Sequence, residues 1–374
     1  MEKNAFLILV PWLAIGGAEN FILELAKFLE SKRFSLHIIA ANRSKDVAGD
    51  SAADFEAFTP FVFQLPHFLR EEMWAPFIVN YIGRRNITNL FLCGCPYIYP
   101  MLPDIRRLFP NVKIYDQLFN NSAIGHVESN RQYAEYIDIT FVVAEKIRSS
   151  ILKQYGGNPQ KVRAIYHGAD LRVFDPDAVS EKQAREKFDL PSGKKIILYA
   201  GRISVEKNPN LFLDLSAEFK DNMDCLFVMA GDGPIVGEIT ANAEQRGLRN
   251  VFFLGFVEPC DMPLLYKLAT ALVITSNVEG IPLAIYEALA MNVPIITSDV
   301  GGISDIVKNR KNGYLCKKED KYDFADSIYK VLREPPTELR TSLGMQHDWK
   351  NVFQAYMRVF EPSIAVPGSS CPSG

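Results

Sequence analysis

Short apolar runs rich in β-formers alternate with amphipathic helical runs through the second half of the chain. The run KIILYAG at 195–201 predicts a strand, and residues 208–220 predict the helix that follows it. Continuous apolar strands separated by helices are typical of parallel sheets with crossover helices. The pattern therefore predicts an α/β, doubly wound domain. Its further elements are strands at 224–231, 251–255, 271–275 and 293–298, and helices at 235–247, 262–269 and 282–291.

The first half repeats the theme less regularly. Residues 5–10 predict a strand, Gly16-Gly17 follows, and residues 18–30 predict a helix. The aromatic-rich segment 55–74 fits neither period. A second doubly wound sheet is expected, with the junction near 167–180, where Gly, Pro and Asp break the periodicity. Further strands are expected at 36–41, 89–93, 112–115 and 139–144, and a late amphipathic helix at 349–361.

The bulk numbers restrict the partners and the location. A chain of 374 residues is long enough for two domains, and its net charge of −3 argues against a nucleic acid partner. Residues 1–165 carry 18 basic and 16 acidic side chains, which is compatible with peripheral contact to an anionic membrane. No apolar run reaches the length of a membrane span, and the start reads as a strand, not a signal peptide. Scattered cysteines without a zinc pattern predict free thiols in a reducing cytoplasm.

Two carboxylates flank a glycine-proline turn in the stretch SNVEGIPLAIYE. Glu279 lies in the loop after the expected strand 271–275, and Glu287 lies in the helix that follows. The free amides of a first helical turn can face a phosphate, and carboxylates can accept hydrogen bonds from sugar hydroxyls. The stretch therefore indicates a site for a phosphorylated, hydroxyl-rich ligand.

A guanidinium and an ammonium follow another buried strand. Arg202 and Lys207 come directly after the strand 195–201, so they should point beyond the carboxyl end of the sheet. This pair suits a diphosphate, although the same residue types also occur in solvated charged loops.

Glycine turns end several of the other strands. Gly17 after the first strand permits close approach of a ligand or simply makes a tight strand-helix turn, and the GxGxxG fingerprint of a dinucleotide site is missing. Gly231 and Gly233 shape the nucleotide side of the expected cleft or serve only as turn residues. The backbone near Val257 could border a nucleobase. His126 lies in a polar segment where a functional role is as expected as a structural one, whereas His37 lies in a strand and should be a core residue.

Taken in order, these elements resemble glycosyltransferase family 4, the retaining transferases with the GT-B fold. The matching pieces cover almost the whole chain and are most specific between residues 195 and 315. The resemblance implies two facing Rossmann-like domains and a last helix that crosses back to the first domain. The implied bounds are 1–168 for the N-terminal acceptor-binding domain, 169–345 for the C-terminal nucleotide-sugar-binding domain, 346–361 for the crossover helix and 362–374 for a disordered tail. The matching pieces are Gly16-Gly17, 167–170, Gly201-Arg202 with Lys207, 230–234, 254–257, Glu279 with Glu287, and 293–302.

The resemblance also implies roles for individual residues. Arg202 and Lys207 would bind the donor diphosphate and stabilise the departing phosphate, Glu287 would hold the ribose hydroxyls and Glu279 would contact the donor sugar. The amides that would line the phosphate and sugar belong to Gly17, Gly280, Ile281 and Leu283.

The sequence departs from the family pattern at three places. Asn208 replaces a common glycine, and Asp305 stands where relatives often have Glu. The histidine that relatives often carry near the acceptor has no counterpart in VKIYDQLFNN, so Tyr115, Asp116 or His126 would take its place.

The expected activity is transfer of a sugar, with retention and without a metal or cofactor, from a nucleotide diphosphate donor to a hydroxyl of a glycan or lipid-linked acceptor. A UDP-sugar donor and cell-surface polysaccharide synthesis are expected from the family. The free thiols and the charge of the N-terminal half add the expectation of a cytoplasmic enzyme with peripheral contact to the inner face of the membrane. The alternatives are a sugar-nucleotide epimerase on the same fold and a non-catalytic nucleotide-sugar-binding module.

Overall fold

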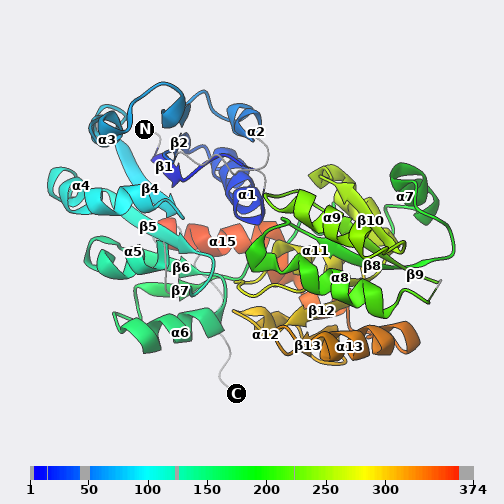
Figure 1. Ribbon diagram of the computed structural model, residues 1–374. Helices are drawn as coiled ribbons and strands as arrows, with labels where there is room; N and C mark the ends of the chain where they lie inside the picture. The colour runs from blue at the N-terminus through cyan, green and yellow to red at the C-terminus, as the bar shows by residue number, and fades with distance from the viewer. Residues whose placement is uncertain (1–3, 15, 43–50, 123–125, 223, 362–374) are drawn as a thin grey trace, which may run out of the picture.

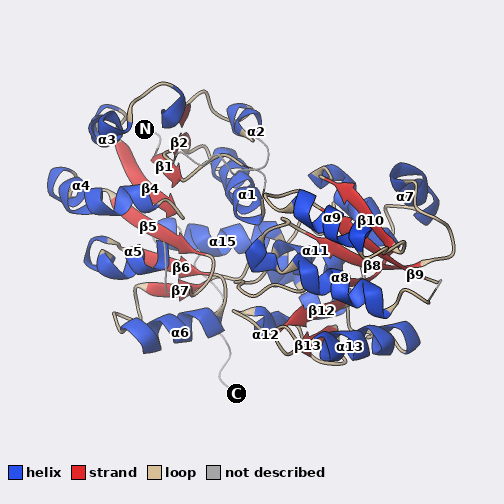
Figure 2. Ribbon diagram, viewed as in Figure 1, coloured by secondary structure: helices blue, strands red, loops and turns tan. Residues whose placement is uncertain are grey.

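Two separate parallel sheets, each flanked by helices, form the centre of the molecule (Figure 1, Figure 2). The computed structural model describes residues 4–14, 16–42, 51–122, 126–222 and 224–361. The predicted tail at 362–374 lies outside the described residues.

The first sheet has the strand order β3-β2-β1-β4-β5-β6-β7. All neighbouring strands are parallel. Its strands are β1 (Ala5–Val10), β2 (Ser35–Ala40), β3 (Val62–Gln64), β4 (Ile87–Cys93), β5 (Lys113–Leu118), β6 (Ile139–Val142) and β7 (Val162–Ala164). The helices of this half are α1 (Gly17–Ser31), α2 (Ala52–Glu56), α3 (Trp74–Arg84), α4 (Leu102–Leu108), α5 (His126–Gln132) and α6 (Glu145–Tyr155).

The second sheet has the order β10-β9-β8-β11-β12-β13, again with parallel neighbours. Its strands are β8 (Lys195–Ala200), β9 (Cys225–Ala230), β10 (Val251–Gly255), β11 (Ala269–Ile274), β12 (Ile295–Ser298) and β13 (Gly313–Cys316). The helices of this half are α7 (Glu181–Phe188), α8 (Pro209–Glu218), α9 (Val236–Gln245), α10 (Met262–Leu268), α11 (Leu283–Ala290), α12 (Ile303–Ile306), α13 (Lys321–Arg333) and α14 (Arg340–Leu343). The predicted doubly wound α/β class is confirmed.

The last helix, α15 (Trp349–Phe360), returns to the first half of the chain, as predicted. Phe353 and Tyr356 are buried in the same apolar cluster as Phe6 and Phe21. In Figure 1 the helix lies between the two sheets, next to the first one. The chain therefore crosses between the domains twice, before β8 and before α15.

The two crossings lie side by side. The Ala169 amide donates to the His347 carbonyl (3.0 Å), and the Trp349 amide donates to the Ala169 carbonyl (3.2 Å). A Cβ at Gly168 would lie 1.8 Å from the His347 oxygen, so only glycine permits this approach. The bounds of the two domains on either side of these crossings stay a prediction.

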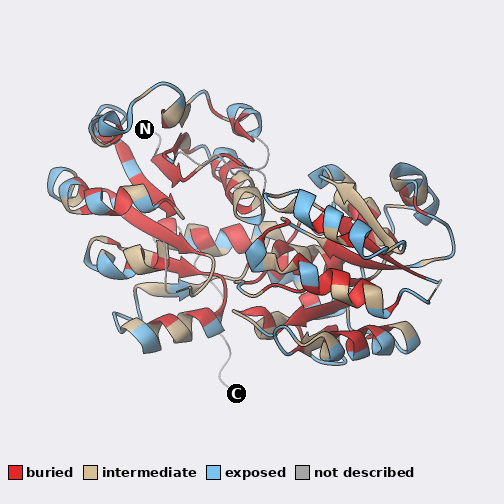
Figure 3. Cartoon of the chain, viewed as in Figure 1, coloured by how far each residue is buried: buried red, intermediate tan, exposed pale blue. Residues whose placement is uncertain are grey.

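Burial follows the sheets (Figure 3). The strands β1, β4 and β9 are buried almost throughout, while the helices bury one stripe and expose the other. His37 is buried, bonded to Tyr81 (2.8 Å) and stacked on Phe61, which confirms it as a core residue. Of the described cysteines, all five are free, and only Cys260 is exposed. None of the described helices is long and apolar enough to cross a membrane.

Candidate active site

The predicted site residues follow the strands at which each sheet reverses its order. In the first sheet β1 and β4 are neighbours, and in the second β8 and β11 are neighbours. Gly17 follows β1, Arg202 and Lys207 follow β8, and Glu279 follows β11. In open α/β sheets, ligands bind beyond the carboxyl ends of the strands at such switch points.

The glycine turn after β1 lies against the start of α11. A Cβ at Gly17 would lie 3.8 Å from Leu283 Cγ, so the first residues of α1 and α11 are neighbours although they belong to different domains. Each helix begins here, with its first amides and the positive end of its dipole. Two helix starts at one place favour an anionic ligand.

Lys207 and Glu279 form an ion pair with an Nζ–Oε1 distance of 2.5 Å. The Lys207 side chain is 27% exposed and that of Glu279 only 9%. The loops that carry them are tied together, because Thr275 Oγ1 donates to the Lys207 carbonyl (2.9 Å) and the Asn277 amide donates to the Glu206 carbonyl (2.8 Å). A phosphate approaching Lys207 would therefore meet an ammonium that already has an acidic partner.

Arg202 lies near an acidic side chain of the other domain, Glu19. Burial raises the pKa of Glu19, while hydrogen bonds, including one from the Trp12 indole (3.1 Å), and the positive charge of Arg202 act in the opposite direction. Glu19 was not among the site residues predicted from the sequence. The sequence pattern that could have identified Glu19 is an acidic residue in the first turn of the helix that follows two glycines.

Glu287 is held by the hydroxyl of Tyr266, which donates to its Oε2 atom (2.9 Å). Tyr266 lies on α10, so the contact joins two neighbouring helices of the second domain. Burial raises the pKa of Glu287 to about 7, and the Tyr266 hydrogen bond opposes that rise. The carboxyl can therefore exchange a proton near neutral pH.

Three predicted donor-side residues have a packing role. A Cβ at Gly231 would lie 1.9 Å from the Gly201 oxygen, and one at Gly233 would lie 2.3 Å from the Ile203 oxygen. Both glycines thus let the loop after β9 lie on the loop that carries Arg202. Val257 is half-buried against a large apolar cluster that contains residues of both halves of the chain.

Gly280 and Ile281 lie at the domain boundary. A Cβ at Gly280 would lie only 1.6 Å from the Phe119 carbonyl oxygen, at the end of β5. Ile281 is buried, and a Cβ at Gly302 would lie 3.1 Å from its Cγ1 atom. The backbone of Phe119 was missed from the sequence, because a carbonyl oxygen carries no residue-type signal.

The structure removes Tyr115 and Asp116 from the acceptor side. Tyr115 is a core residue. The centroid of its ring lies 4.9 Å from that of Phe360, and the ring is stacked with Phe141. Asp116 is fully buried, where its Oδ2 atom accepts hydrogen bonds from Tyr99 (2.8 Å) and Asn130 (2.5 Å). Both predictions are wrong because these residues lie within β5 and not beyond its end.

His126 remains as the N-terminal candidate. It is the first residue of α5, and its Nε2 atom is buried without a hydrogen-bond partner among the described residues. Burial lowers the pKa of His126, so the imidazole is neutral at physiological pH. A neutral ring could accept or donate one proton, and its role stays a prediction.

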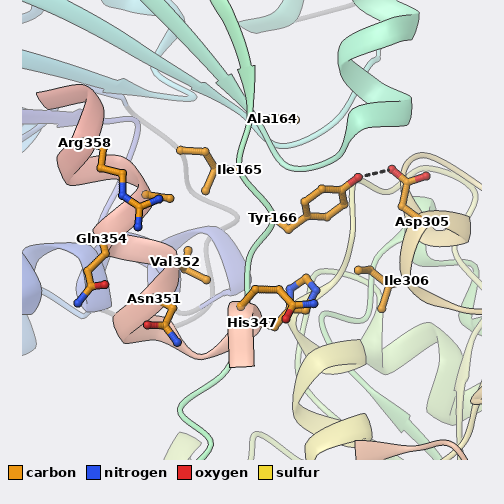
Figure 4. A pocket seen from close by; sticks show the side chains of 12 residues that line it. Ala164, Ile165, Tyr166, Asp305, Ile306, His347, Asn351, Val352, Gln354 and Arg358 are labelled. Atoms are coloured by element: carbon orange, nitrogen blue, oxygen red, sulfur yellow. Dashed lines mark hydrogen bonds between the residues drawn. The ribbon is translucent and has the colours of Figure 1, made fainter. Parts of the chain in front are cut away.

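A hollow of about 580 Å³ lies at the domain boundary away from these residues (Figure 4). Tyr166, Asp305, His347 and Arg358 are among the residues that line it, and none of the predicted site residues does. Within the described parts of the chain, no group of three or more His, Cys, Asp or Glu residues is placed to hold a metal ion.

Comparison with solved structures identifies the fold. The structure of Alr3699/HepE from Anabaena, in complex with UDP and glucose, superimposes with a TM-score of 0.78 at 16% identity. The match covers 95% of this chain and 99% of that one. The two facing parallel-sheet domains are therefore those of the GT-B fold.

Curated sequences similar to this chain include glycosyltransferases and a spore coat protein. Spore coat protein SA of Bacillus subtilis is 27% identical over 322 residues, which cover 78% of this chain and 83% of that protein. A UDP-Gal:alpha-D-GlcNAc-diphosphoundecaprenol alpha-1,3-galactosyltransferase of Escherichia coli is 29% identical over 186 residues, 48% of this chain and 47% of that protein. Several other curated relatives are likewise matched over only about half of their length. The model of the glycosyl transferases group 1 matches residues 180–347 of this chain.

Proposed function

We propose that the protein is a retaining glycosyltransferase that moves a sugar from a nucleotide diphosphate donor to an acceptor hydroxyl without a metal ion. The observation that carries the proposal is the meeting of the two switch points at one place. Lys207 pairs with Glu279 in the second domain, and the start of α1 lies against the start of α11 across the domain boundary. Positive helix ends and a lysine suit a diphosphate, and the carboxylate suits the hydroxyls of a sugar.

Each side chain has a place in this proposal. Arg202 and Lys207 bind the diphosphate, with the Lys207 ammonium exchanging its Glu279 partner for a phosphate oxygen. Glu279 is thereby released to accept hydrogen bonds from the donor sugar. Glu287 accepts hydrogen bonds from the ribose hydroxyls, and the amides of Gly280, Ile281 and Leu283 lie beside the phosphate.

The proposed reaction needs no protein nucleophile. The bond between the anomeric carbon and the diphosphate oxygen breaks, and the acceptor oxygen bonds to the same face of that carbon. The acceptor proton passes to the leaving phosphate, whose growing negative charge is stabilised by Arg202 and Lys207. Preorganised charges of this kind usually contribute about 10²–10³ in rate each.

The relatives support a proposal for the donor and acceptor classes. HepE was solved with UDP and glucose, and the Escherichia coli relative is named for a UDP-sugar donor and a lipid diphosphate acceptor. We therefore propose a UDP-sugar donor and a glycan or lipid-linked acceptor of cell-surface polysaccharide synthesis. Action in the cytoplasm, with peripheral contact to the inner face of the membrane, fits such an acceptor.

The test is a panel of UDP- and GDP-sugars, assayed for nucleotide release in the presence of EDTA. We expect release from a UDP-sugar in wild type, and a loss of about 10²–10³-fold in Lys207→Ala. Lys187→Ala is the matched control, because it also removes a lysine from an ion pair, that with Asp261 (2.8 Å), outside the site.

Three outcomes would contradict the proposal. Activity that disappears in EDTA and returns with a divalent ion would exclude the metal-free reaction. A new sugar isomer formed from UDP-GlcNAc alone would indicate an epimerase. If calorimetry detects no binding of UDP or GDP at millimolar concentration, both the transferase and the epimerase are excluded.

A further inference from the structure

Helix α6 begins at the domain boundary with no cap of its own. Its N-cap residue is Ala144, whose side chain has no atom that can accept a hydrogen bond. The first amides of any helix lack partners within the helix, and a capping side chain usually supplies one. The first amides of α6 must therefore find partners outside the local sequence.

The partners come from the inter-domain segment and from the second domain. The Glu145 amide donates to the Tyr166 hydroxyl (3.0 Å), and the Lys146 amide donates to Oδ2 of Asp305 (3.1 Å). The Tyr166 hydroxyl in turn donates to the same Asp305 oxygen (2.9 Å), as Figure 4 shows. Burial raises the pKa of Tyr166 to about 12, so this hydroxyl keeps its proton.

The Lys146 side chain adds two contacts across the same boundary. Its Nζ atom donates to Oδ1 of Asp299 (3.1 Å) and to Oγ of Ser304 (2.8 Å). Both acceptors lie just before or within α12, next to Asp305. The start of an N-terminal helix is thus bonded to one short segment of the C-terminal domain, 299–305.

This segment is packed directly on the loop that carries Glu279. The Gly302 amide donates to the Gly280 carbonyl (2.9 Å). A Cβ at Gly301 would lie 2.1 Å from the Glu279 oxygen, and one at Gly302 would lie 2.3 Å from Ala144 Cβ. The segment that α6 contacts is therefore itself bonded to and packed on the Glu279 loop.

We propose that Asp305 is a positioning residue, which caps α6 from the opposite domain and so holds the two domains closed with the Glu279 loop in place. Two domains joined by two chain crossings can rotate relative to each other about those crossings. Opening would separate Asp305 from the Lys146 amide and leave the first turn of α6 without that partner. The helix cap therefore stabilises only the closed arrangement.

The variants are Asp305→Ala, which removes the cap, and Asp305→Asn, which keeps an oxygen that can accept from the Lys146 amide. Asp320→Ala is the matched control. Asp320 caps α13 through the Tyr322 and Asp323 amides (both 3.1 Å), with cap and helix in the same domain. Both alanine variants lose a carboxylate cap, but only one loses it across the boundary.

Two measurements need no substrate. Amide hydrogen exchange should become about 5- to 30-fold faster at Glu145 and Lys146 in Asp305→Ala, the range that corresponds to loss of a typical cap. The radius of gyration from X-ray scattering should increase in the same variant. Asp305→Asn should recover most of both effects, and Asp320→Ala should change exchange in α13 only.

The third measurement concerns the donor and rests on the proposed function. In Asp305→Ala we expect a higher KM for the donor with a smaller change in kcat, because fewer molecules are closed before binding. Unchanged exchange in α6 together with an unchanged radius of gyration would overturn the inference, whatever the activity. If wild type turns over no nucleotide-sugar, the proposed function fails and the first two measurements still decide the role of Asp305.

Discussion

The raised pKa of Glu287 gives the clearest test of the site. Burial raises the pKa of this carboxyl from its ordinary value of 4.5 to about 7, so the folded protein keeps a proton that the unfolded chain releases. Stability should therefore fall as pH rises from about 4.5 to 7 and stay low above that. Glu287→Gln keeps the shape and cannot ionise, so its stability lacks this decline.

The size of the effect follows from the same values. A rise from 4.5 to about 7 corresponds to about 3 kcal/mol in the free energy of unfolding once the carboxyl is fully ionised. Between pH 5 and pH 8 the variant should gain about 2–3 kcal/mol relative to wild type. Other titrating groups, such as Asp116, cancel because both proteins are compared at each pH.

The assay is urea unfolding followed by circular dichroism at half-unit pH steps, with UDP binding measured by calorimetry at the same steps. Ribose hydroxyls donate to the ionised carboxylate, so UDP should bind wild type about tenfold more weakly at pH 6 than at pH 8. Binding to Glu287→Gln should be weaker and nearly independent of pH over this range.

Two results would refute the reasoning, and they refute different parts of it. A free-energy difference between wild type and Glu287→Gln that stays constant from pH 5 to pH 8 would show that the carboxyl ionises normally. The expected pH-dependent stability without any pH dependence of UDP binding would show a buried carboxyl that does not contact the nucleotide.

Three further predictions concern the boundary and the core. Lys207→Ala should lower turnover by about 10²–10³-fold in a nucleotide-release assay, with Lys187→Ala near wild type. Gly280→Ala should weaken the closed arrangement by about 1–3 kcal/mol, because its Cβ would overlap the Phe119 oxygen, and a normal radius of gyration would contradict this. Asp116, whose pKa burial raises to about 7, should behave like Glu287 in unfolding experiments, so Asp116→Asn should become relatively more stable as pH rises, with unchanged UDP binding.

The positions of Arg202, Lys207 and Glu279 could be predicted from the sequence because they depend on where strands end. Arg202, Lys207 and Glu279 each follow a long apolar run that can only be a buried parallel strand. Parallel strands bring their carboxyl ends to one edge, so residues far apart in sequence meet there. The ion pair between Lys207 and Glu279 is the outcome, although the sequence did not indicate that the two would bind each other.

Tyr115 and Asp116 were mispredicted for a physical reason. The segment VKIYDQLFNN was treated as strand 112–115 followed by a loop, but β5 continues to Leu118. The polar residues Asp116 and Gln117 interrupt the apolar pattern by which the strand would be recognised. Both are nevertheless buried, because their side chains are hydrogen-bonded, and Gln117 accepts from the hydroxyl of Tyr356 on the crossover helix (2.7 Å). Because the hydrogen-bond partners of Asp116 and Gln117 lie elsewhere in the sequence, no local sequence pattern indicates that these two residues are buried.

Short elements were missed for a related reason. The strands β3 and β7 have three residues each, too few to establish a period of two. The aromatic segment 55–74 contributes β3 and then covers α3, where Phe63 contacts Phe77 and Tyr81 ring to ring. The spacing of its aromatic residues is set by their contacts with α3 and has no regular period.

Part of what the N-terminal domain contributes to the boundary is backbone, and a backbone contact has no residue-type pattern in the sequence. Among the groups that meet the Glu279 loop and α11 are the Phe119 oxygen and Gly17, and the Ala144 Cβ meets Gly302. Backbone contacts depend on glycine in the opposite chain segment, since a single Cβ at Gly280 or Gly302 would collide. Residue type alone therefore does not locate the acceptor site, and the distances between the two domains are needed as well. Because Gly302 touches both Ala144 and Ile281, substitutions at this glycine should disturb domain closure and donor binding together, whereas those at Gly231 should disturb only the loop that carries Arg202.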